Sequence, residues 1–247
     1  MIRVVVPTDS QEEDTFATAL DYARSICAKA GPAVVDVVLL LHSKKQLEHT
    51  NLGGFLGKAT VKALGAGPVA LGGGLRLSLE ILTKRPMLTR PSVILAYYAD
   101  DGLLDIADGL RPVEGVVAVP WIPKSADGWI QRWGPIIHGQ ASQPAASLIS
   151  DTVVVGALER LTRTINLSTG LLNASDKKKA DETLRILRAK GHADPSNQIQ
   201  SWAIRNGWKA DYAKDLETLS KRVWALTTKP SLSKIENAEE RYARWTE

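Results

Sequence analysis

Cysteine is nearly absent from this chain of 247 residues, which contains only Cys27. A single cysteine excludes an internal disulfide and a cysteine-based metal site. The histidines are also few and far apart, so no pair has the i, i+4 spacing of a helical zinc site: they are His42, His49, His138 and His192. The Gly-x-Ser-x-Gly pattern of a hydrolase nucleophile is missing as well. The sequence therefore predicts no metal site and no catalytic residue.

Long apolar runs are missing too. No stretch approaches the ~18 apolar residues that a membrane span needs. The first ten residues, MIRVVVPTDS, lack the extended apolar segment and the cleavage site of a secretion signal. We therefore expect a cytoplasmic protein with no membrane association.

Tryptophan and positive charge are both concentrated late in the chain. Residues 1–120 hold no tryptophan, and the seven of the chain are Trp121, Trp129, Trp133, Trp202, Trp208, Trp224 and Trp245. Through Ser150 there are 14 Lys and Arg against 14 Asp and Glu, and from Asp151 onward there are 17 against 13, which accounts for the formal charge of +4. This excess permits an anionic partner without requiring one. The asymmetry indicates two modules with different roles.

The first 120 residues alternate between short aliphatic runs and helical patterns. Strands are expected at 3–7, 34–41, 68–71, 92–98 and 115–120, and helices at 57–64, 77–84 and 102–110. A further helix opens at Ser10, where Ser10 and Glu13 have the spacing of a capping box. Aliphatic strands separated by helices are typical of a parallel sheet covered on both faces. The sequence therefore predicts a doubly wound, mostly parallel five-stranded α/β domain over residues 1–120.

The remainder is predicted to be helical. Residues 121–150 mix Pro, Gly, Ser and Trp without periodicity, and we interpret them as a Trp-rich connector. Residues 151–247 form a helical module, with Asp151 capping its first helix and Ser175 its second. The Asp194-Pro195 pair marks the start of a third helix.

The opening residues Val4-Val5-Val6-Pro7-Thr8-Asp9-Ser10 lead into an amphipathic helix and a strand that ends at His42. This order resembles the universal stress protein family of nucleotide-binding α/β proteins. The resemblance implies an adenine nucleotide as ligand, with Asp9 in the place of the family's adenosine-contacting aspartate. Because ligands of open parallel sheets lie at the carboxyl ends of the strands, the candidate nucleotide-binding residues are Thr8, Asp9, His42 and Asp100.

The phosphate-binding part of that family's pattern is not present. Where the family has a glycine-rich loop after the fourth strand, this chain has Ala99-Asp100-Asp101-Gly102. Two carboxylates there would repel a triphosphate. The segment 53–60, GGFLGKAT, looks like a P-loop but lacks its first glycine and the hydroxyl after the lysine.

The stretch from Gln198 to Lys209 contains Trp-Ala followed by a Gly-Trp turn. It resembles the small helical DNA-binding domain of Lsr2-type nucleoid proteins, although the Arg-Gly-Arg that reads the minor groove in that family is replaced by Asn206-Gly207-Trp208. The resemblance implies phosphate contacts, for which the candidates are Lys177, Lys178, Lys179, Arg205 and Lys209.

Two functional classes remain open. The favoured one is a non-enzymatic binding or scaffold protein, with a ligand- or partner-binding α/β domain and a helical module that mediates assembly. A protein partner or a homo-oligomer is then expected, with aromatic anchors at Trp208, Trp224 or Trp245. One alternative is a nucleotide-dependent enzyme or sensor with its site at the strand tips. The other is a DNA-associated protein that binds nucleic acid through the basic helices.

Overall fold

The computed structural model describes residues 1–84, 86–141 and 145–246. The chain forms two compact units, residues 1–145 and residues 146–247. Residues 142–144 of the predicted connector and Glu247 of the predicted helical module lie outside the described residues. Within the described part, no helix has both the length and the apolar character that crossing a bilayer requires.

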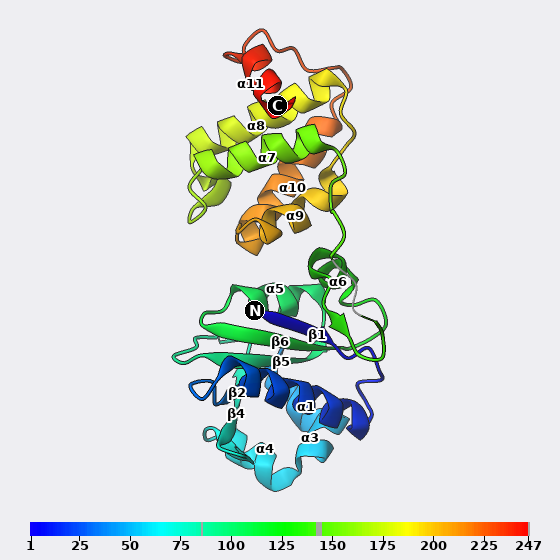
Figure 1. Ribbon diagram of the computed structural model, residues 1–247, viewed down its shortest axis with the longest axis vertical. Coiled ribbons are helices and arrows are strands. Elements are labelled where there is room, and N and C mark those ends of the chain that lie inside the picture. The colour runs from blue at the N-terminus through cyan, green and yellow to red at the C-terminus, as the bar shows by residue number, and fades with distance from the viewer. Residues whose placement is uncertain (85, 142–144, 247) are drawn as a thin grey trace. The chain divides into compact units, whose positions relative to one another are not determined.

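The first unit is built on one mixed sheet, shown in Figure 1, with the strand order β3-β4-β2-β5-β6-β1-β7. All neighbouring strands pair in parallel except β3 and β4, which are antiparallel. The strands are β1 (Ile2–Val5), β2 (Asp36–Leu41), β3 (Val69–Gly72), β4 (Leu75–Ile81), β5 (Ser92–Ala99), β6 (Val113–Pro120) and β7 (Ile136–Ile137). The predicted α/β class with a mostly parallel sheet is confirmed, whereas the predicted count of five strands is wrong, because the described residues form seven.

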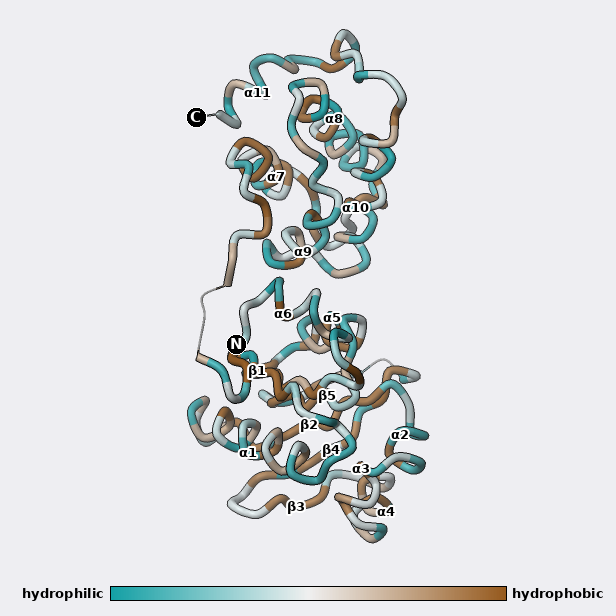
Figure 2. The backbone as a smooth tube through the Cα atoms, turned by 90° about the vertical axis from the view of Figure 1, so that its right-hand side faces the viewer, coloured by the Kyte–Doolittle hydropathy of each residue, from teal (hydrophilic) through white to brown (hydrophobic). Residues whose placement is uncertain are grey.

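Successive residues of the central strands pack into separate cores on the two faces of the sheet. Leu39 and Leu41 belong to one core, and Val38 and Leu40 to the other. The first core is covered by α1 (Glu13–Ala30), α2 (Lys44–His49), α3 (Asn51–Leu56) and α4 (Lys58–Leu64). The second is covered by α5 (Asp101–Gly109) and α6 (Asp127–Trp133). The central strands are buried on both faces, which explains the hydrophobic colouring along β1, β2 and β5 in Figure 2.

Two local predictions in this unit are wrong. The segment predicted as a helix over 77–84 is largely strand β4, in which Leu75, Leu77, Leu79 and Ile81 alternate with polar residues. Period-two alternation is the signal of a strand, and the polar side of β4 is fixed by Arg76, whose Nε and Nη2 lie 2.8 Å from the carboxylate of Asp36. The capping box is also absent, because α1 begins only at Glu13.

Three aspartates form a polar stripe along α5. Asp101, Asp105 and Asp108 are spaced i, i+4 and i+7, so they share one face of the helix. Asp101 accepts hydrogen bonds from the backbone N–H groups of Gly128 at 3.2 Å and Trp129 at 2.7 Å, at the start of α6. Asp105 forms an ion pair with Arg132 of α6, whose side chain is only 4% exposed. The stripe therefore binds α6 to α5 at both ends of α6.

Asp108 extends the same stripe to strand β1 of the sheet. One of its oxygens lies 3.0 Å from Nε of Arg3 on β1, and the other accepts a hydrogen bond from Nε1 of Trp129 at 2.8 Å. The Arg3 guanidinium also lies 3.5 Å from the ring centroid of Trp133, a cation–π distance. Burial lowers the pKa of Arg3 and raises the pKa of Asp105, and the oppositely charged partners Asp108 and Arg132 oppose these shifts. Charges in such surroundings are tolerated only as pairs.

We expect Asp108→Ala to destabilise the first unit by about 3 kcal/mol, since it removes the acceptor of Arg3 and of the buried Trp129 indole. Urea unfolding followed by circular dichroism measures the loss. Asp21→Ala is the matched control, because Asp21 is 72% exposed in its pair with Arg24, and it should cost less than about 0.5 kcal/mol. Equal losses for the two variants would contradict this account of the α5 stripe.

The second unit is helical. Its elements are α7 (Thr152–Thr164), a 3₁₀ turn η1 (Gly170–Leu172), α8 (Ala174–Lys190), α9 (Ser196–Arg205), α10 (Ala210–Trp224) and α11 (Ala238–Thr246). The predicted cap of α7 is confirmed, since Asp151 accepts from the N–H groups of Val153 and Val154. The predicted cap of α8 by Ser175 is wrong, because Asn173 caps that helix. The general assignment of this region as helical is confirmed.

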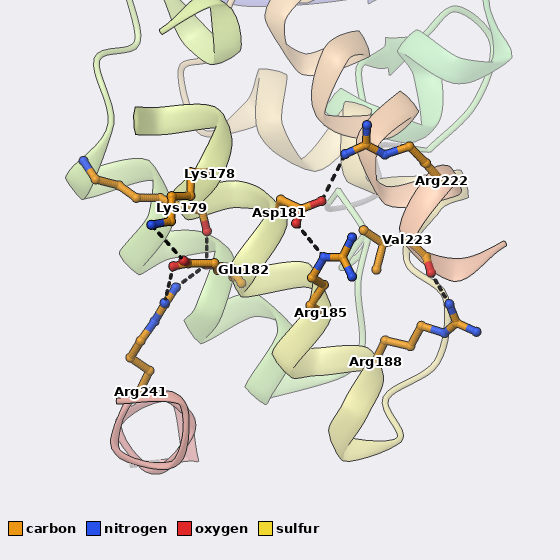
Figure 3. A network of polar contacts seen from close by, with 10 residues as sticks. Lys178, Lys179, Asp181, Glu182, Arg185, Arg188, Arg222, Val223 and Arg241 are labelled. Atoms are coloured by element: carbon orange, nitrogen blue, oxygen red, sulfur yellow. Dashed lines mark hydrogen bonds and ion pairs between the residues drawn. The ribbon is translucent and has the colours of Figure 1, made fainter. Parts of the chain in front are cut away.

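Helix α8 connects the other helices through charged side chains, as Figure 3 shows. Asp181 pairs with Arg185 one turn along α8 and, at 3.0 Å, with Arg222 of α10. Glu182 pairs at 2.8 Å with Arg241 of α11. Between these charged residues α8 also carries Leu184 and other aliphatic residues that are fully buried. A helix this rich in charged residues can therefore pack against its neighbours, because its acids are paired and its aliphatic residues are buried.

Asp151 is also part of a chain of contacts between α7, the end of α8 and α11. Its Oδ2 lies 2.6 Å from Nδ1 of His192, and Nε2 of His192 lies 3.1 Å from the hydroxyl of Tyr242. Partial burial acts to raise the pKa of Asp151, but hydrogen bonds from His192 and from the backbone of α7 outweigh it and hold the pKa below its ordinary value of 3.8. The ionised carboxylate is therefore the form that stabilises the fold.

Because the folded-state pKa of Asp151 is depressed, its contribution is fully present well above pH 3.8 and is lost as the pH falls through the folded-state pKa. Asp151→Ala should lower the free energy of unfolding by about 1 kcal/mol at neutral pH. The gap between wild type and variant should shrink under acid, measured by urea unfolding at a series of pH values. Asp151→Asn, which retains a capping oxygen, should lose less. A gap that does not vary with pH would contradict the assigned role of the charge.

Candidate functional site

The first unit has an open cleft at the carboxyl ends of β1 and β6, with a volume of about 930 Å³. The chain leaves β1 toward α1 on one face of the sheet and leaves β6 toward α6 on the other. Adjacent strands whose connections diverge to opposite faces leave a crevice between them, the usual ligand position in α/β folds. The cleft is therefore located where topology alone would place a binding site.

The walls of the cleft combine apolar and polar groups. Trp121 and Ile122, directly after β6, are 51% and 63% exposed, which is unusual for residues of this size. Thr8 and Asp9 from the loop after β1 line the same cleft. The remaining polar lining comes from the segment before α1, from the α2–α3 junction, and from the loop before α6 with its first residue: Ser10, Gln11, His49, Thr50, Asn51, Lys124 and Asp127. A cleft that combines an exposed indole with hydrogen-bonding groups suits a ring-bearing polar molecule.

Two tyrosines at the end of β5 hold the loops that form this cleft. Tyr98 has a left-handed backbone with φ of 56°, and the β5–β6 register shifts at that point. Both Tyr97 and Tyr98 consequently belong to the same core, although neighbours on a regular strand face opposite ways. The Tyr97 hydroxyl donates to the carbonyl of Ser10 at 3.0 Å, and the Tyr98 hydroxyl donates to Oγ1 of Thr50 at 2.9 Å. Burial raises the pKa of Tyr97, so its hydroxyl stays a donor.

The four candidate nucleotide-binding residues fall into two places. Thr8 and Asp9 line the cleft, where Asp9 accepts a hydrogen bond from the N–H of Gln11 at 2.9 Å. His42 and Asp100 follow β2 and β5 and pair with each other at 3.2 Å, outside the lining of the cleft. Asp100 also accepts from the N–H of Leu103 and so caps α5. The carboxyl ends of β2 and β5 and those of β1 and β6 are separate places along the sheet. The four candidate residues therefore form two groups.

Sequence reasoning misses the other half of the cleft. It places Trp121 and Ile122 in a connector, yet they line the cleft, and the residues after them form α6 and β7. The pattern Pro120-Trp121-Ile122-Pro123, directly after a buried strand, is the available signal. No sequence pattern marks Asn51 as a residue of the cleft. Its side-chain amide donates to the carbonyl of Gln11, which is 40 positions away in the sequence.

The candidate phosphate-contacting residues of the second unit do not form one exposed surface free of other contacts. Lys177 and Lys178 are exposed on α8, and Lys178 lies 3.8 Å from Glu182. The other three donate to backbone carbonyls, in the pairs Lys179 to Thr164, Arg205 to Ala146 and Lys209 to Ser168. Lys179 is also held by Asp176, whose pKa is lowered by hydrogen bonds from the backbone of Asn166 and from Lys179. Lys179, Arg205 and Lys209 therefore hold backbone segments in place as well as carrying charge.

The candidate interface tryptophans are mostly internal. Trp208 is 3% exposed, and its Nε1 donates to Oγ1 of Thr162 at 3.0 Å. Trp245 is 8% exposed, and its ring lies 6.3 Å from that of Tyr242. Trp224 is half-buried at the end of α10. Packing within the unit therefore accounts for Trp208 and Trp245.

Together these features define a two-unit protein: an α/β unit with a cleft at a switch point, and a helical unit rich in charged contacts. In comparisons with known proteins, a family model described as "Domain of unknown function (DUF1889)" matches residues 150–246, which lie within the helical unit. No curated protein and no solved structure gave a significant match.

We expect Trp208→Ala to destabilise the helical unit by about 3 kcal/mol, because it empties a buried site and leaves Thr162 without its donor. Thermal or urea unfolding measures the loss. Trp224→Ala is the matched comparison and should cost much less, since that side chain is only half-buried. If Trp208→Ala changed the sedimentation coefficient of the protein but not its stability, Trp208 would be an interface residue after all.

Proposed function

We propose that this protein is a non-enzymatic binding protein whose α/β unit holds a nucleoside-like molecule in the cleft between β1 and β6. The observation that carries the proposal is that the exposed indole of Trp121 and the carboxylate of Asp9 line the same cleft at a topological switch point. A base can stack on the indole, and a carboxylate can accept the hydrogen bonds of sugar hydroxyls.

The charge of the cleft favours a ligand without several phosphates. Its lining holds the carboxylates of Asp9 and Asp127 against the single lysine Lys124. Asp9 uses one oxygen for Gln11, and within the described residues its other oxygen has no hydrogen-bond partner. The two carboxylates would repel a triphosphate, so adenosine fits this cleft better than ATP does.

The hydroxyl groups of the cleft support binding rather than catalysis. Thr8 is hydrogen-bonded to the hydroxyl of Thr15 at 2.8 Å, and Ser10 donates to the carbonyl of Trp121 at 3.3 Å. Nucleophilic catalysis needs a general base within hydrogen-bond reach of the hydroxyl, and neither contact supplies one. That the helical unit mediates assembly with a protein partner or a second copy of the chain stays a prediction.

Isothermal titration calorimetry with adenosine, AMP and ATP tests the proposal, preceded by mass spectrometry of small molecules that co-purify. Adenosine should bind more tightly than ATP. Trp121→Ala should weaken adenosine binding about tenfold, the usual contribution of one stacked base, and Asp9→Ala should weaken it further through the lost hydrogen bonds to the ribose.

His42→Ala is the matched control, because His42 lies at the neighbouring strand tips but outside the cleft, and it should leave the affinity unchanged. The proposal fails if adenosine does not bind at millimolar concentration and no nucleoside co-purifies. It also fails if His42→Ala weakens binding as much as Trp121→Ala does.

A further inference from the structure

The helical unit has a small, open basic pocket lined by α7, α8 and α11, with a volume of about 350 Å³. Five cationic side chains line it, together with one tryptophan: Arg160, Arg163, Lys179, Arg241, Arg244 and Trp245. No carboxylate is among the residues that line this pocket within the described chain. The concentration of positive charge in one cavity is a property of the tertiary structure, because its members come from three helices.

The pocket is formed on well-packed residues of the helical unit. Its apolar lining residues Leu161 and Trp245 are 3% and 8% exposed, so they belong to the core of the unit. Helix α11 lies close to α7 because Gly156 faces the carbonyl oxygen of Trp245, and a Cβ at that position would come within 3.1 Å of it. The buried hydroxyl of Thr183 accepts a hydrogen bond from Arg241 at 3.2 Å. The wall is therefore formed by packed helices rather than by a loop.

The five cations differ in how firmly they are held. Lys179 lies 3.1 Å from Asp176, and Arg241 lies 2.8 Å from Glu182, as Figure 3 shows for Arg241. These carboxylates are largely buried, with side chains 9% and 18% exposed, so they fix the two cations at the pocket wall.

The other three cations are available to a ligand. Among the described residues, Arg163 lies 3.5 Å from Glu159 and Arg244 lies 3.9 Å from Glu240, and both carboxylates are exposed i, i+4 partners. Arg244 Nε also donates to the backbone carbonyl of Glu240 at 3.2 Å. Exposed pairs of this kind contribute little. Arg160 makes no ion pair or hydrogen bond with any residue that the structure describes.

We infer that this pocket binds a small phosphorylated molecule, with the phosphate group held by Arg160, Arg163 and Arg244. Guanidinium groups bind phosphate oxygens through paired, charge-assisted hydrogen bonds, and several arginines around one cavity can bind one phosphate group from different sides. The volume is at the lower end of the range for small-molecule sites, which favours a compact anion over a nucleic-acid strand. This site is separate from the nucleoside cleft, because it lies in the other unit.

Calorimetric titration of the full-length protein with pyrophosphate at low and moderate salt tests the inference. Arg160→Ala and Arg244→Ala should each weaken pyrophosphate binding about tenfold, the usual loss for one charge-assisted contact. Arg222→Ala is the matched control, since it removes an arginine of the same unit that lies outside this pocket, and it should leave binding unchanged. Circular dichroism verifies that each variant is folded.

A second arm of the titration uses a short DNA duplex. The inference is overturned if pyrophosphate does not bind at millimolar concentration. It is also overturned if all three variants weaken binding equally, which would indicate a general charge effect, or if the duplex binds more tightly than pyrophosphate and loses affinity with Arg160→Ala. Trp121→Ala should retain pyrophosphate binding in full, so failure of the nucleoside proposal and failure of this one are distinguishable.

Discussion

The aspartate stripe of α5 is the constraint on which most of the first unit depends. Its three carboxylates lie at the interface between α5 and α6, where each has a cationic or N–H partner from α6 or β1. Gly128 at the start of α6 leaves room for this contact, because a Cβ there would come within 2.6 Å of the Asp101 carboxylate and displace it. Since charges buried in this way must be paired, α6 has one favourable position over the sheet, and that position sets one wall of the cleft.

The opposite wall of the cleft follows from the backbone of β5. The left-handed conformation at Tyr98 sends two consecutive tyrosines to the same side, where their hydroxyls reach two different loops. One loop carries Asp9 and the other carries Asn51. Because each tyrosine is buried and donates one hydrogen bond, the loops are held at fixed distances from the sheet. A binding surface made of loops thereby gains the rigidity of the core beneath it.

In the helical unit, the acidic side chains of α8 are likewise paired with opposite charges. Helix α8 is rich in charge, yet its acids each contact a base from another helix or from the next turn. Because these acids are already paired, several arginines of α7 and α11 have only weak partners. Those arginines line one pocket. The net charge of +4 is modest when averaged over the chain, but its distribution in space is uneven. Local concentration of charge, rather than the total, decides whether an anion can be bound.

The sequence by itself determined the α/β class, the parallel central strands and the helical second unit, because aliphatic runs and helical periodicity are local consequences of burial. It also determined the Asp151 cap, which depends on neighbouring residues alone. Strand β4 could also have been predicted from the sequence, because apolar and polar residues alternate from Leu75 through Ile81. Only the tertiary structure decided that α6 packs against the sheet, that Asp9 and Trp121 line one cleft while His42 pairs with Asp100, and that Arg160 and Arg244 share a pocket. Each of these depends on residues far apart in the chain, and no local pattern records which distant side chain will satisfy a buried charge or complete a cleft.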